Sequence, residues 1–261
     1  MRLKGKVILV TGSTTGIGEG MVRRFAAEGA AVMIHGTRAD AAKKLHNTLH
    51  EDDVPVGFTL GSLADPAVPA RLVEETVSRF GRIDGLVNNA AVMSRGNLET
   101  TDLAAFDLTL AINLRAPLFL AQAVLPYFRK QGGGRILNIG SINGYCGERN
   151  QLAYSASKGG LTTLTRNLAD AHGAEGIRVN QFNVGWTLTP NEFELKKKEG
   201  LPDDWPQRIS KTYAPSGRLL SPDDIAWAAV YFLSDEAALI NGAILDLEQY
   251  PLIGRNPAKE T

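Results

Sequence analysis

The sequence predicts a doubly wound α/β fold, in which a parallel sheet of about seven strands carries helices on both faces. Short runs of apolar, often β-branched residues alternate along the chain with longer segments of helical periodicity. The apolar runs show no polar face, which is typical of strands that are covered on both sides. Strand–helix alternation of this kind implies right-handed crossovers and therefore a parallel sheet.

The apolar runs predict strands at Val7–Val10, Ala31–His35, Val56–Leu60, Ile83–Asn88, Arg135–Gly140, Arg178–Asn183 and Ala243–Asp246. Helical patterns lie between these runs. The pattern from Thr101 to Lys130 predicts a long helix that is broken near Asn113, and a further helix is expected from about Ala153 to His172. No repeat, low-complexity tract or linker divides the chain, so residues 1–261 are expected to form a single domain.

One segment, residues 190–217, interrupts the alternation because it is long, polar and rich in proline. A loop of this length in a compact domain is usually a lid or a binding loop. Four aromatic residues lie in or beside it: Trp186, Phe193, Trp205 and Tyr213. Two interpretations of these aromatic side chains stay open, namely that they close over a substrate or that they pack the lid against the body.

Composition places the chain among ordinary globular proteins. Lys and Arg total 28, as do Asp and Glu, so no bulk charge indicates binding to nucleic acid or to an anionic membrane. The only cysteine is Cys146, which excludes an intramolecular disulfide and fits a reducing compartment. The N-terminus has no apolar segment typical of a signal peptide, and no apolar run approaches the ~20 residues of a membrane span. A cytoplasmic location is therefore expected, and no residues are put forward as metal ligands.

A glycine-rich turn follows the first expected strand. The run Thr11-Gly12-Ser13-Thr14-Thr15-Gly16-Ile17-Gly18 leads directly into an amphipathic helical pattern. Strand, glycine turn and helix form the context of a dinucleotide site, because glycines let the backbone approach a pyrophosphate and the helix N-terminus offers free N–H groups to it. This turn indicates a Rossmann-type fold with its site at the carboxyl ends of the strands.

Tyr154 and Lys158 lie four positions apart in the sequence, so on a helix they share a face. A phenol with a pKa near ~10 is too weakly acidic for proton transfer at neutral pH, and a nearby cation lowers that pKa by roughly 1–3 units. Lys158, helped by a cationic cofactor ring, would therefore turn Tyr154 into a general acid or base.

Taken together, these motifs resemble the short-chain dehydrogenase/reductase family over nearly the whole chain. Besides the glycine turn, the run Asn88-Asn89-Ala90-Ala91 is similar to the family's Asn-Asn-Ala-Gly motif, with Ala91 in place of glycine. The resemblance implies a catalytic tetrad formed by Asn113, Ser141, Tyr154 and Lys158. In it Ser141 hydrogen-bonds the reacting oxygen, Tyr154 transfers the proton, Lys158 also holds the nicotinamide ribose, and Asn113 holds a proton-relaying water.

The resemblance also implies a set of cofactor contacts along the chain. They are Gly12, Thr14, Gly16, Ile17, Gly18, Thr37, Arg38, Ser62, Leu63, Asn89, Ala90, Tyr154, Lys158, Gly185, Thr187 and Thr189. Besides Ala91, two further positions depart from the family pattern. Ser62 replaces an aspartate near the adenine, and Val184 replaces a proline before Gly185, which predicts a less fixed nicotinamide loop.

The end of the second expected strand indicates a preference for NADP(H) over NAD(H). A carboxylate there would bind the ribose hydroxyls and repel a 2′-phosphate. This chain has Gly36 at that place, followed by Thr37 and Arg38, which offer a hydroxyl and a cation.

The sequence therefore predicts an NAD(P)-dependent oxidoreductase that transfers a hydride between a nicotinamide cofactor and a secondary alcohol or ketone. The polar segment from Asn143 to Gln151 favours a sugar or polyol as its small-molecule substrate. Two alternatives stay open: a 3-oxoacyl thioester reductase, and a non-catalytic dinucleotide-binding redox sensor.

The resemblance further implies a homotetramer, assembled partly through the helix that carries Tyr154 and Lys158. After the last expected strand, the family's Asp-Gly-Gly is replaced by Asp246-Leu247-Glu248. The apolar tail that follows, Tyr250 to Ile253, is expected to pack either at a subunit interface or on its own subunit.

Overall fold

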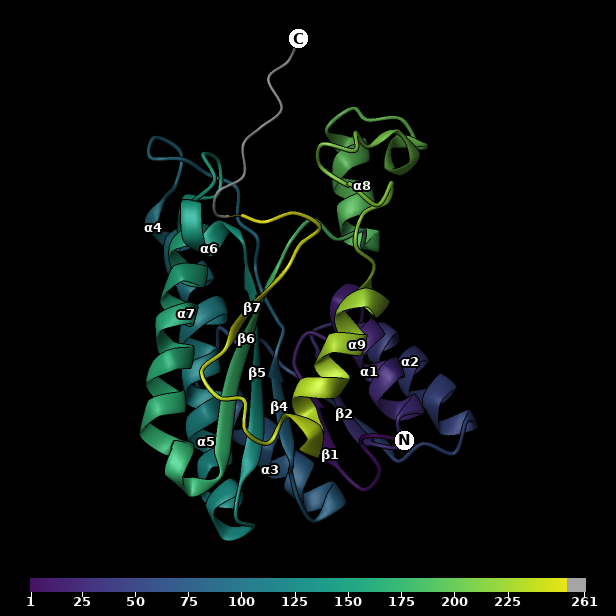
Figure 1. The fold of residues 1–261 in the computed structure, drawn as a ribbon, viewed down its shortest axis with the longest axis vertical. Coiled ribbons are helices and arrows are strands. Elements are labelled where there is room, and N and C mark those ends of the chain that lie inside the picture. The colour runs from purple at the N-terminus through teal and green to yellow at the C-terminus, as the bar shows by residue number, and fades with distance from the viewer. Residues whose placement is uncertain (253–261) are drawn as a thin grey trace.

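The computed structural model describes residues 1–252. Seven parallel strands form one sheet in the order β3-β2-β1-β4-β5-β6-β7 (Figure 1). Their bounds are β1 Val7–Val10, β2 Ala31–Gly36, β3 Val56–Leu60, β4 Gly85–Asn88, β5 Gly134–Ser141, β6 Ile177–Val184 and β7 Ile244–Leu247. This topology confirms the predicted doubly wound α/β fold.

The observed strands match the predicted ones closely, and β1 and β3 have the predicted bounds. The largest difference is at β4, which begins at Gly85 rather than at Ile83. The side chain of Asp84 accepts a hydrogen bond from the Val7 amide at 2.9 Å, so this residue ties β1 to the approach of β4 before the regular ladder starts.

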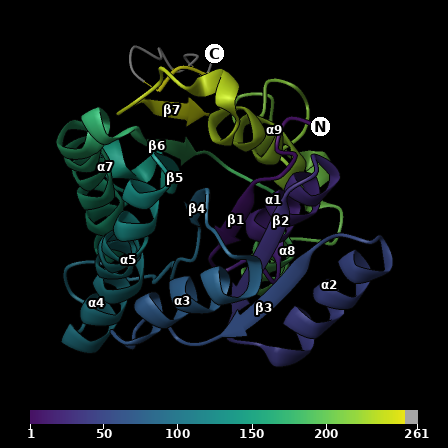
Figure 2. The same ribbon diagram turned by 90° about the horizontal axis from the view of Figure 1, so that it is seen from below.

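The helices and short helical turns connect the strands. They are α1 Gly16–Ala27, α2 Ala39–Glu51, α3 Val68–Phe80, α4 Leu103–Leu110, the π-helix η1 Ala111–Arg115, α5 Ala116–Lys130, α6 Asn143–Cys146, α7 Leu152–His172, η2 Gly173–Glu175, α8 Pro190–Lys198, η3 Trp205–Arg208, α9 Pro222–Leu233 and η4 Asp235–Ala237. Seen from below, α1, α2 and α9 cover one face of the sheet, and α3, α5 and α7 cover the other (Figure 2).

Five strands, β2, β1, β4, β5 and β6, supply side chains to two cores, as the apolar runs predicted. Ile8 and Val10 of β1 pack with Phe25 of α1 in one core, whereas Leu9 packs with Leu120 of α5 in the other. Because successive strand residues point to opposite faces, a strand covered on both sides needs apolar residues at every position.

The predicted break near Asn113 takes the form of a π turn inside one continuous helix from Leu103 to Lys130. At its end the Ala116 amide donates to the carbonyl of Ala111, five residues back. Length and a hydropathy of 1.5 alone would allow this helix to cross a membrane. It nevertheless buries Leu120, Val124 and Phe128 against the sheet, which is the pattern of a core helix.

The lid segment forms a lobe that stands beyond the carboxyl ends of the strands (Figure 1). It contains α8 and η3, and it has a small core of its own around Trp205, Ala214 and Leu219. The lobe therefore packs largely on itself while overhanging the edge of the sheet where a doubly wound fold has its site.

Candidate active site

The glycine turn between β1 and α1 requires glycine for reasons of space and of conformation. Gly12 and Gly16 have φ values of +61° and +58°, in the left-handed region that favours glycine. A Cβ atom at Gly12 would lie 2.7 Å from Cα of Ala90, and one at Gly18 would lie 2.5 Å from the carbonyl oxygen of Gly12. The turn thus brings bare backbone to the start of α1.

The first turn of α1 fits a pyrophosphate. Its N–H groups have no partner inside the helix, and the N-cap residue Thr15 makes no capping hydrogen bond with its side chain. These N–H groups and the helix dipole together favour an anion. Gly16, Ile17 and Gly18 therefore lie where a dinucleotide cofactor would place its phosphates.

The side-chain amide of Asn89 is hydrogen-bonded to the glycine turn. Its Nδ2 donates to the carbonyl oxygens of Thr11 and Gly12, at 2.9 and 3.0 Å. The backbone amides of Asn89 and Ala90 both donate to Oγ1 of Thr11, at 3.0 and 3.1 Å. In this structure the two residues predicted as cofactor contacts position the glycine turn from the side of β4.

The adenosine side of the site is open. Thr37, Arg38 and Ser62 are exposed. Leu63 is buried. A Cβ atom at Gly36 would lie 2.7 Å from Cγ2 of Thr14, so the glycine at the end of β2 gives Thr14 its space.

Ser141, Tyr154 and Lys158 come together at the end of β5. Ser141 is the last residue of that strand, Tyr154 and Lys158 lie on α7, and the Ser141 side chain lies close enough to the phenol of Tyr154 to act on its pKa. Nζ of Lys158 donates to the carbonyl oxygen of Ile139 at 2.7 Å and lies 5.6 Å from the centroid of the Tyr154 ring. The structure thus places the phenol, the hydroxyl and the ammonium in one group.

Burial shifts the pKa values of Tyr154 and Lys158. Burial raises the pKa of Tyr154 above the usual value for a phenol, and the Ser141 side chain only partly opposes the rise. Burial also lowers the pKa of Lys158 to about 8. The lowering of the phenol pKa by Lys158, helped by a cationic cofactor ring, concerns the site with its cofactor bound and stays a prediction.

Asn113 lies in the π turn and is buried. Its Oδ1 accepts from the Val92 amide at 2.8 Å, while its Nδ2 donates to the Val92 carbonyl and to Oγ of Ser157, at 2.9 and 3.0 Å. The side chain therefore joins three segments of the site, the β4–α4 connection, the π turn and α7.

The segment after β6 is held firmly despite Val184. The Gly185 amide donates to the Leu247 carbonyl at 2.9 Å, and the Trp186 amide donates to the carboxylate of Glu248 at 3.3 Å. Thr189 caps α8 through its hydroxyl, and its side chain lies about 3.4 Å from where a Cβ of Gly16 would be. The looser loop that the missing proline predicts stays a prediction.

Comparison with known proteins decides the family. A family model described as enoyl-(acyl carrier protein) reductase matches residues 12–248. D-threitol dehydrogenase of Mycolicibacterium smegmatis is 37% identical over 95% of this chain and 93% of that protein. Levodione reductase of Leifsonia aquatica is 34% identical over 95% of this chain and 94% of that protein. The chain belongs to the short-chain dehydrogenase/reductase family.

A solved structure agrees with this assignment. The structure of L-sorbose reductase from Gluconobacter frateurii, complexed with NADPH and L-sorbose, has a TM-score of 0.92 to this chain at 28% sequence identity. The match covers 98% of this chain and 100% of that one. As a short-chain dehydrogenase/reductase the protein is an oxidoreductase that uses a nicotinamide cofactor, which confirms the predicted class of enzyme.

The structure favours one of the two interpretations of the aromatic residues. Trp205 is 2% exposed and stacks between Trp186 and Phe193, with ring centroids 5.8 and 6.3 Å away. Tyr213 meets the edge of Trp186 at 6.5 Å. In this short-chain dehydrogenase/reductase the aromatic side chains therefore pack against one another within the lid.

Several contacts at the site were not predicted from the sequence. Asn143 donates through its backbone amide to Oγ of Ser141 at 3.2 Å, and through Nδ2 to Oε1 of Gln151 at 3.0 Å. His35 contacts the glycine turn. The signal for His35 was present, because it is the one titratable residue in the otherwise apolar run of β2.

Proposed function

We propose that this enzyme is an NADPH-preferring reductase of small polyhydroxylated ketones, or the dehydrogenase of the corresponding polyols. The observation that carries the proposal is the group formed by Ser141, Tyr154 and Lys158 at the end of β5, beside the glycine turn. A non-catalytic redox sensor has no use for a serine and a lysine placed beside the phenol of a half-buried tyrosine, so we set that alternative aside.

When bound, the nicotinamide cofactor supplies or accepts the hydride. The phenol of Tyr154 would act as the general acid that protonates the oxygen of a ketone, once the charges of Lys158 and of a bound cofactor ring lower its pKa. Ser141 orients that oxygen, and its own hydroxyl is oriented by the backbone amide of Asn143. Lys158 favours the phenolate that remains after proton transfer, because its ammonium lies beside the ring.

The side chain of Asn113 has its hydrogen bonds to Val92 and Ser157. A proton-relaying water at this position would therefore bind main-chain groups of the π turn. A π turn leaves backbone carbonyls less completely paired than an α-helix does, and such turns often occur at functional sites.

A polar substrate is supported by Glu148. One carboxylate oxygen of Glu148, Oε2, is buried without a hydrogen-bond partner within residues 1–252. The amide of the same residue donates to Oγ of Ser155, the neighbour of Tyr154, at 3.2 Å. An unpaired buried carboxylate oxygen is costly, and a substrate hydroxyl would satisfy it. The names of the relatives, D-threitol dehydrogenase and L-sorbose reductase, agree with this choice.

A substrate panel tests the proposal. Purified enzyme is assayed with ketoses, polyols, simple ketones and a 3-oxoacyl thioester, and the absorbance of the reduced cofactor is followed. We expect the highest kcat/KM for a ketose or polyol. We also expect Glu148→Gln to raise KM for that substrate while leaving a simple ketone unaffected. The highest kcat/KM for the thioester would favour the alternative of a 3-oxoacyl thioester reductase, the activity for which a 30% identical relative from Thermotoga maritima is named.

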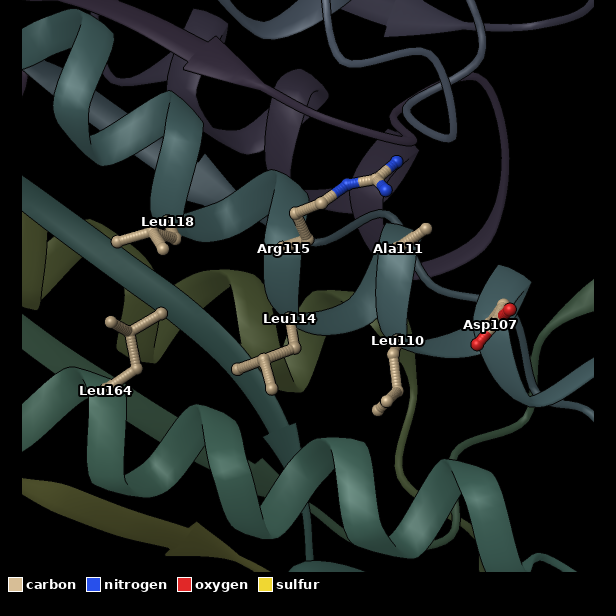
Figure 3. A pocket seen from close by; sticks show the side chains of 7 residues that line it. All are labelled: Asp107, Leu110, Ala111, Leu114, Arg115, Leu118 and Leu164. Atoms are coloured by element: carbon tan, nitrogen blue, oxygen red, sulfur yellow. The ribbon is translucent and has the colours of Figure 1, made fainter.

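We further propose a homotetramer that buries the apolar side of the helix from Leu103 to Lys130. A groove of about 700 Å³ lies between this helix and α7, lined by Leu110, Leu114, Leu118 and Leu164 (Figure 3). Beside it, Leu118 and Phe119 are 42% and 39% exposed. Apolar surface of this kind on a protein of this size is typical of an interface.

Light scattering coupled to size exclusion tests the assembly. Leu118→Glu should reduce the mass from that of a tetramer, because it places a charge on the apolar side. Lys43→Glu, on the exposed side of α2, serves as the control and should leave the mass unchanged. A monomeric native protein would exclude the proposed tetramer.

A further inference from the structure

His35 is buried between the glycine turn and the segment that follows β3, with only 2% of its surface exposed. Its Nδ1 lies 3.3 Å from the amide nitrogen of Gly12, and its Nε2 lies 3.0 Å from the carbonyl oxygen of Gly61. One imidazole ring therefore contacts two backbone segments that are far apart in the sequence.

These two contacts assign the tautomer. An amide N–H can only donate and a carbonyl can only accept, so Nδ1 of His35 is unprotonated and Nε2 carries the hydrogen. Burial lowers the pKa of His35 to about 4, with a smaller contribution from the charge of Arg71, so the ring is neutral at pH 7.

The backbone of Gly12 is consequently held on both sides, at its N–H and at its carbonyl oxygen. His35 accepts from its N–H on the side of β2, and Asn89 donates to its carbonyl oxygen at 3.0 Å on the side of β4. The main chain of His35 contributes as well, since its carbonyl oxygen accepts from the Ser13 amide at 2.8 Å. Gly12 has a φ of +61°, and a glycine has few conformational preferences of its own, so these partners set the orientation of the turn.

We propose that His35 is a positioning residue for the cofactor, which holds the pyrophosphate turn at Gly12 and the adenine side of the site at Gly61 at a fixed separation. Gly61 directly precedes Ser62 and Leu63, the expected neighbours of the adenine. The inference rests on the proposed use of a nicotinamide dinucleotide. It concerns the adenosine half of the site, because β2 and β3 lie on the opposite side of β1 and β4 from the catalytic strand β5.

Two substitutions distinguish the hydrogen bond of His35 to Gly12 from its hydrogen bond to Gly61. His35→Leu removes both hydrogen bonds, whereas His35→Asn places an amide oxygen close to the position of Nδ1 and retains an acceptor for the Gly12 amide. Calorimetry with full-length protein gives Kd for NADPH and for 2′,5′-ADP, a fragment without nicotinamide. Hydrogen exchange of the peptide containing Gly12 is measured without any ligand.

We expect His35→Leu to weaken both ligands about tenfold and to speed exchange at Gly12, because a backbone donor loses its partner. His35→Asn should recover most of the affinity and the protection. At saturating NADPH the KM for the ketone should not change in either variant. A merely structural role would instead lower Tm and raise the ketone KM together with Kd.

Thr59→Val is the matched control. Thr59 lies opposite His35 in the β2–β3 ladder and is also buried, and valine keeps its shape while removing the hydroxyl. This variant should bind both ligands as the native protein does. Unchanged Kd values in His35→Leu, or no recovery in His35→Asn, would overturn the role of His35.

The role of His35 can be tested independently of the proposed substrate. A protein that binds NADPH but reduces no ketone or polyol contradicts the proposed function, and the Kd series still decides the role of His35. A native protein that binds neither NADPH nor 2′,5′-ADP contradicts both.

Discussion

Arg95 and Glu199 form an ion pair of 2.7 Å that joins the connection between β4 and α4 to the end of the lid helix α8. The segment around Arg95 also contacts the catalytic side, because the Gly96 amide donates to the Asn150 carbonyl and the Leu152 amide donates to the Gly96 carbonyl. Glu199 has a second partner within the lid, Lys196, at 2.8 Å. The lid is thus fastened to the segment that precedes the catalytic helix α7.

We predict that Arg95→Met and Glu199→Gln each raise KM for the substrate more than they change stability. Arg95 is 41% exposed, and exposed ion pairs contribute only about 0–1 kcal/mol to the free energy of unfolding. The pair nevertheless sets where the end of α8 lies. Steady-state kinetics together with urea unfolding measure the two effects.

The reversed pair Arg95→Glu with Glu199→Arg should recover the native KM at low salt, because only the direction of the charges changes. Arg208→Met, which breaks the pair between Arg208 and Asp204 inside the lid, is the control and should leave KM unaltered. Equal KM in Arg95→Met and the native enzyme would show that the pair does not act on the site.

Tyr154→Phe is predicted to lose turnover while retaining cofactor affinity. General acid–base catalysis typically contributes about 10²–10⁴-fold, and this substitution removes the proton donor without changing the ring. Lys158→Ala should reduce turnover and cofactor affinity together. Initial rates measure turnover, and titration with NADPH measures cofactor affinity. Tyr145→Phe is the control: the native Tyr145 hydroxyl donates to Asp246, and its loss should leave turnover unchanged. Near-native turnover in Tyr154→Phe would refute the mechanism.

The fold could be predicted from the sequence because its signals are local. The apolar runs, the glycine turn and the spacing from Tyr154 to Lys158 can each be recognised in a short window. The contacts that were missed join residues far apart in the chain. Glu248 holds the Trp186 amide from 62 residues away, and His35 on β2 contacts Gly12, which follows the neighbouring strand β1 and lies 23 residues away in the sequence.

Electrostatics and tail packing also depend on tertiary structure. The spacing of Tyr154 and Lys158 predicts their proximity, but the pKa of the phenol depends on burial by several segments. For the tail, Gln249 accepts from the amide and hydroxyl of Ser216 at 3.0 and 2.6 Å, so the segment just before it packs on its own subunit. The role of Tyr250 to Leu252 at an interface stays a prediction, and Ile253 lies outside the described residues.

Cofactor choice is predicted to depend on Arg38. Losing one charge-assisted hydrogen bond typically costs roughly 1.5–3 kcal/mol, so Arg38→Ala should weaken NADPH at least tenfold and leave NADH almost unchanged. Thr37→Asp should shift the preference further toward NADH, because a carboxylate there repels a 2′-phosphate. Aspartate at position 36 would be a poorer choice, since its Cβ would meet Thr14.

The ratio of kcat/KM for NADPH and NADH measures this preference. Lys44→Ala, on the exposed surface of the neighbouring helix α2, controls for a general change of surface charge. Equal losses for both cofactors in Arg38→Ala would reject a contact with the 2′-phosphate.

Lys158 is predicted to reduce stability at neutral pH, although it is required for turnover. Its pKa is lowered by burial from the ordinary value to about 8, so the native state binds the proton less tightly than the unfolded state does. Below pH 8 both states are protonated and the full penalty applies, which corresponds to about 3 kcal/mol at most. Between pH 8 and the unfolded pKa near ~10.4 only the unfolded chain holds the proton, so stability rises with pH.

Lys158→Met keeps the length of the side chain and removes the charge. We expect this variant to be more stable than the native protein at pH 7 and to lose that advantage progressively between pH 8 and 10. The hydrogen bond from Nζ to Ile139 reduces the gain, because it already stabilises the charged form. Urea unfolding at pH 7, 9 and 10 gives the difference, with exposed Lys130→Met as the control. A variant that is less stable than the native protein by the same amount at every pH would contradict the burial penalty.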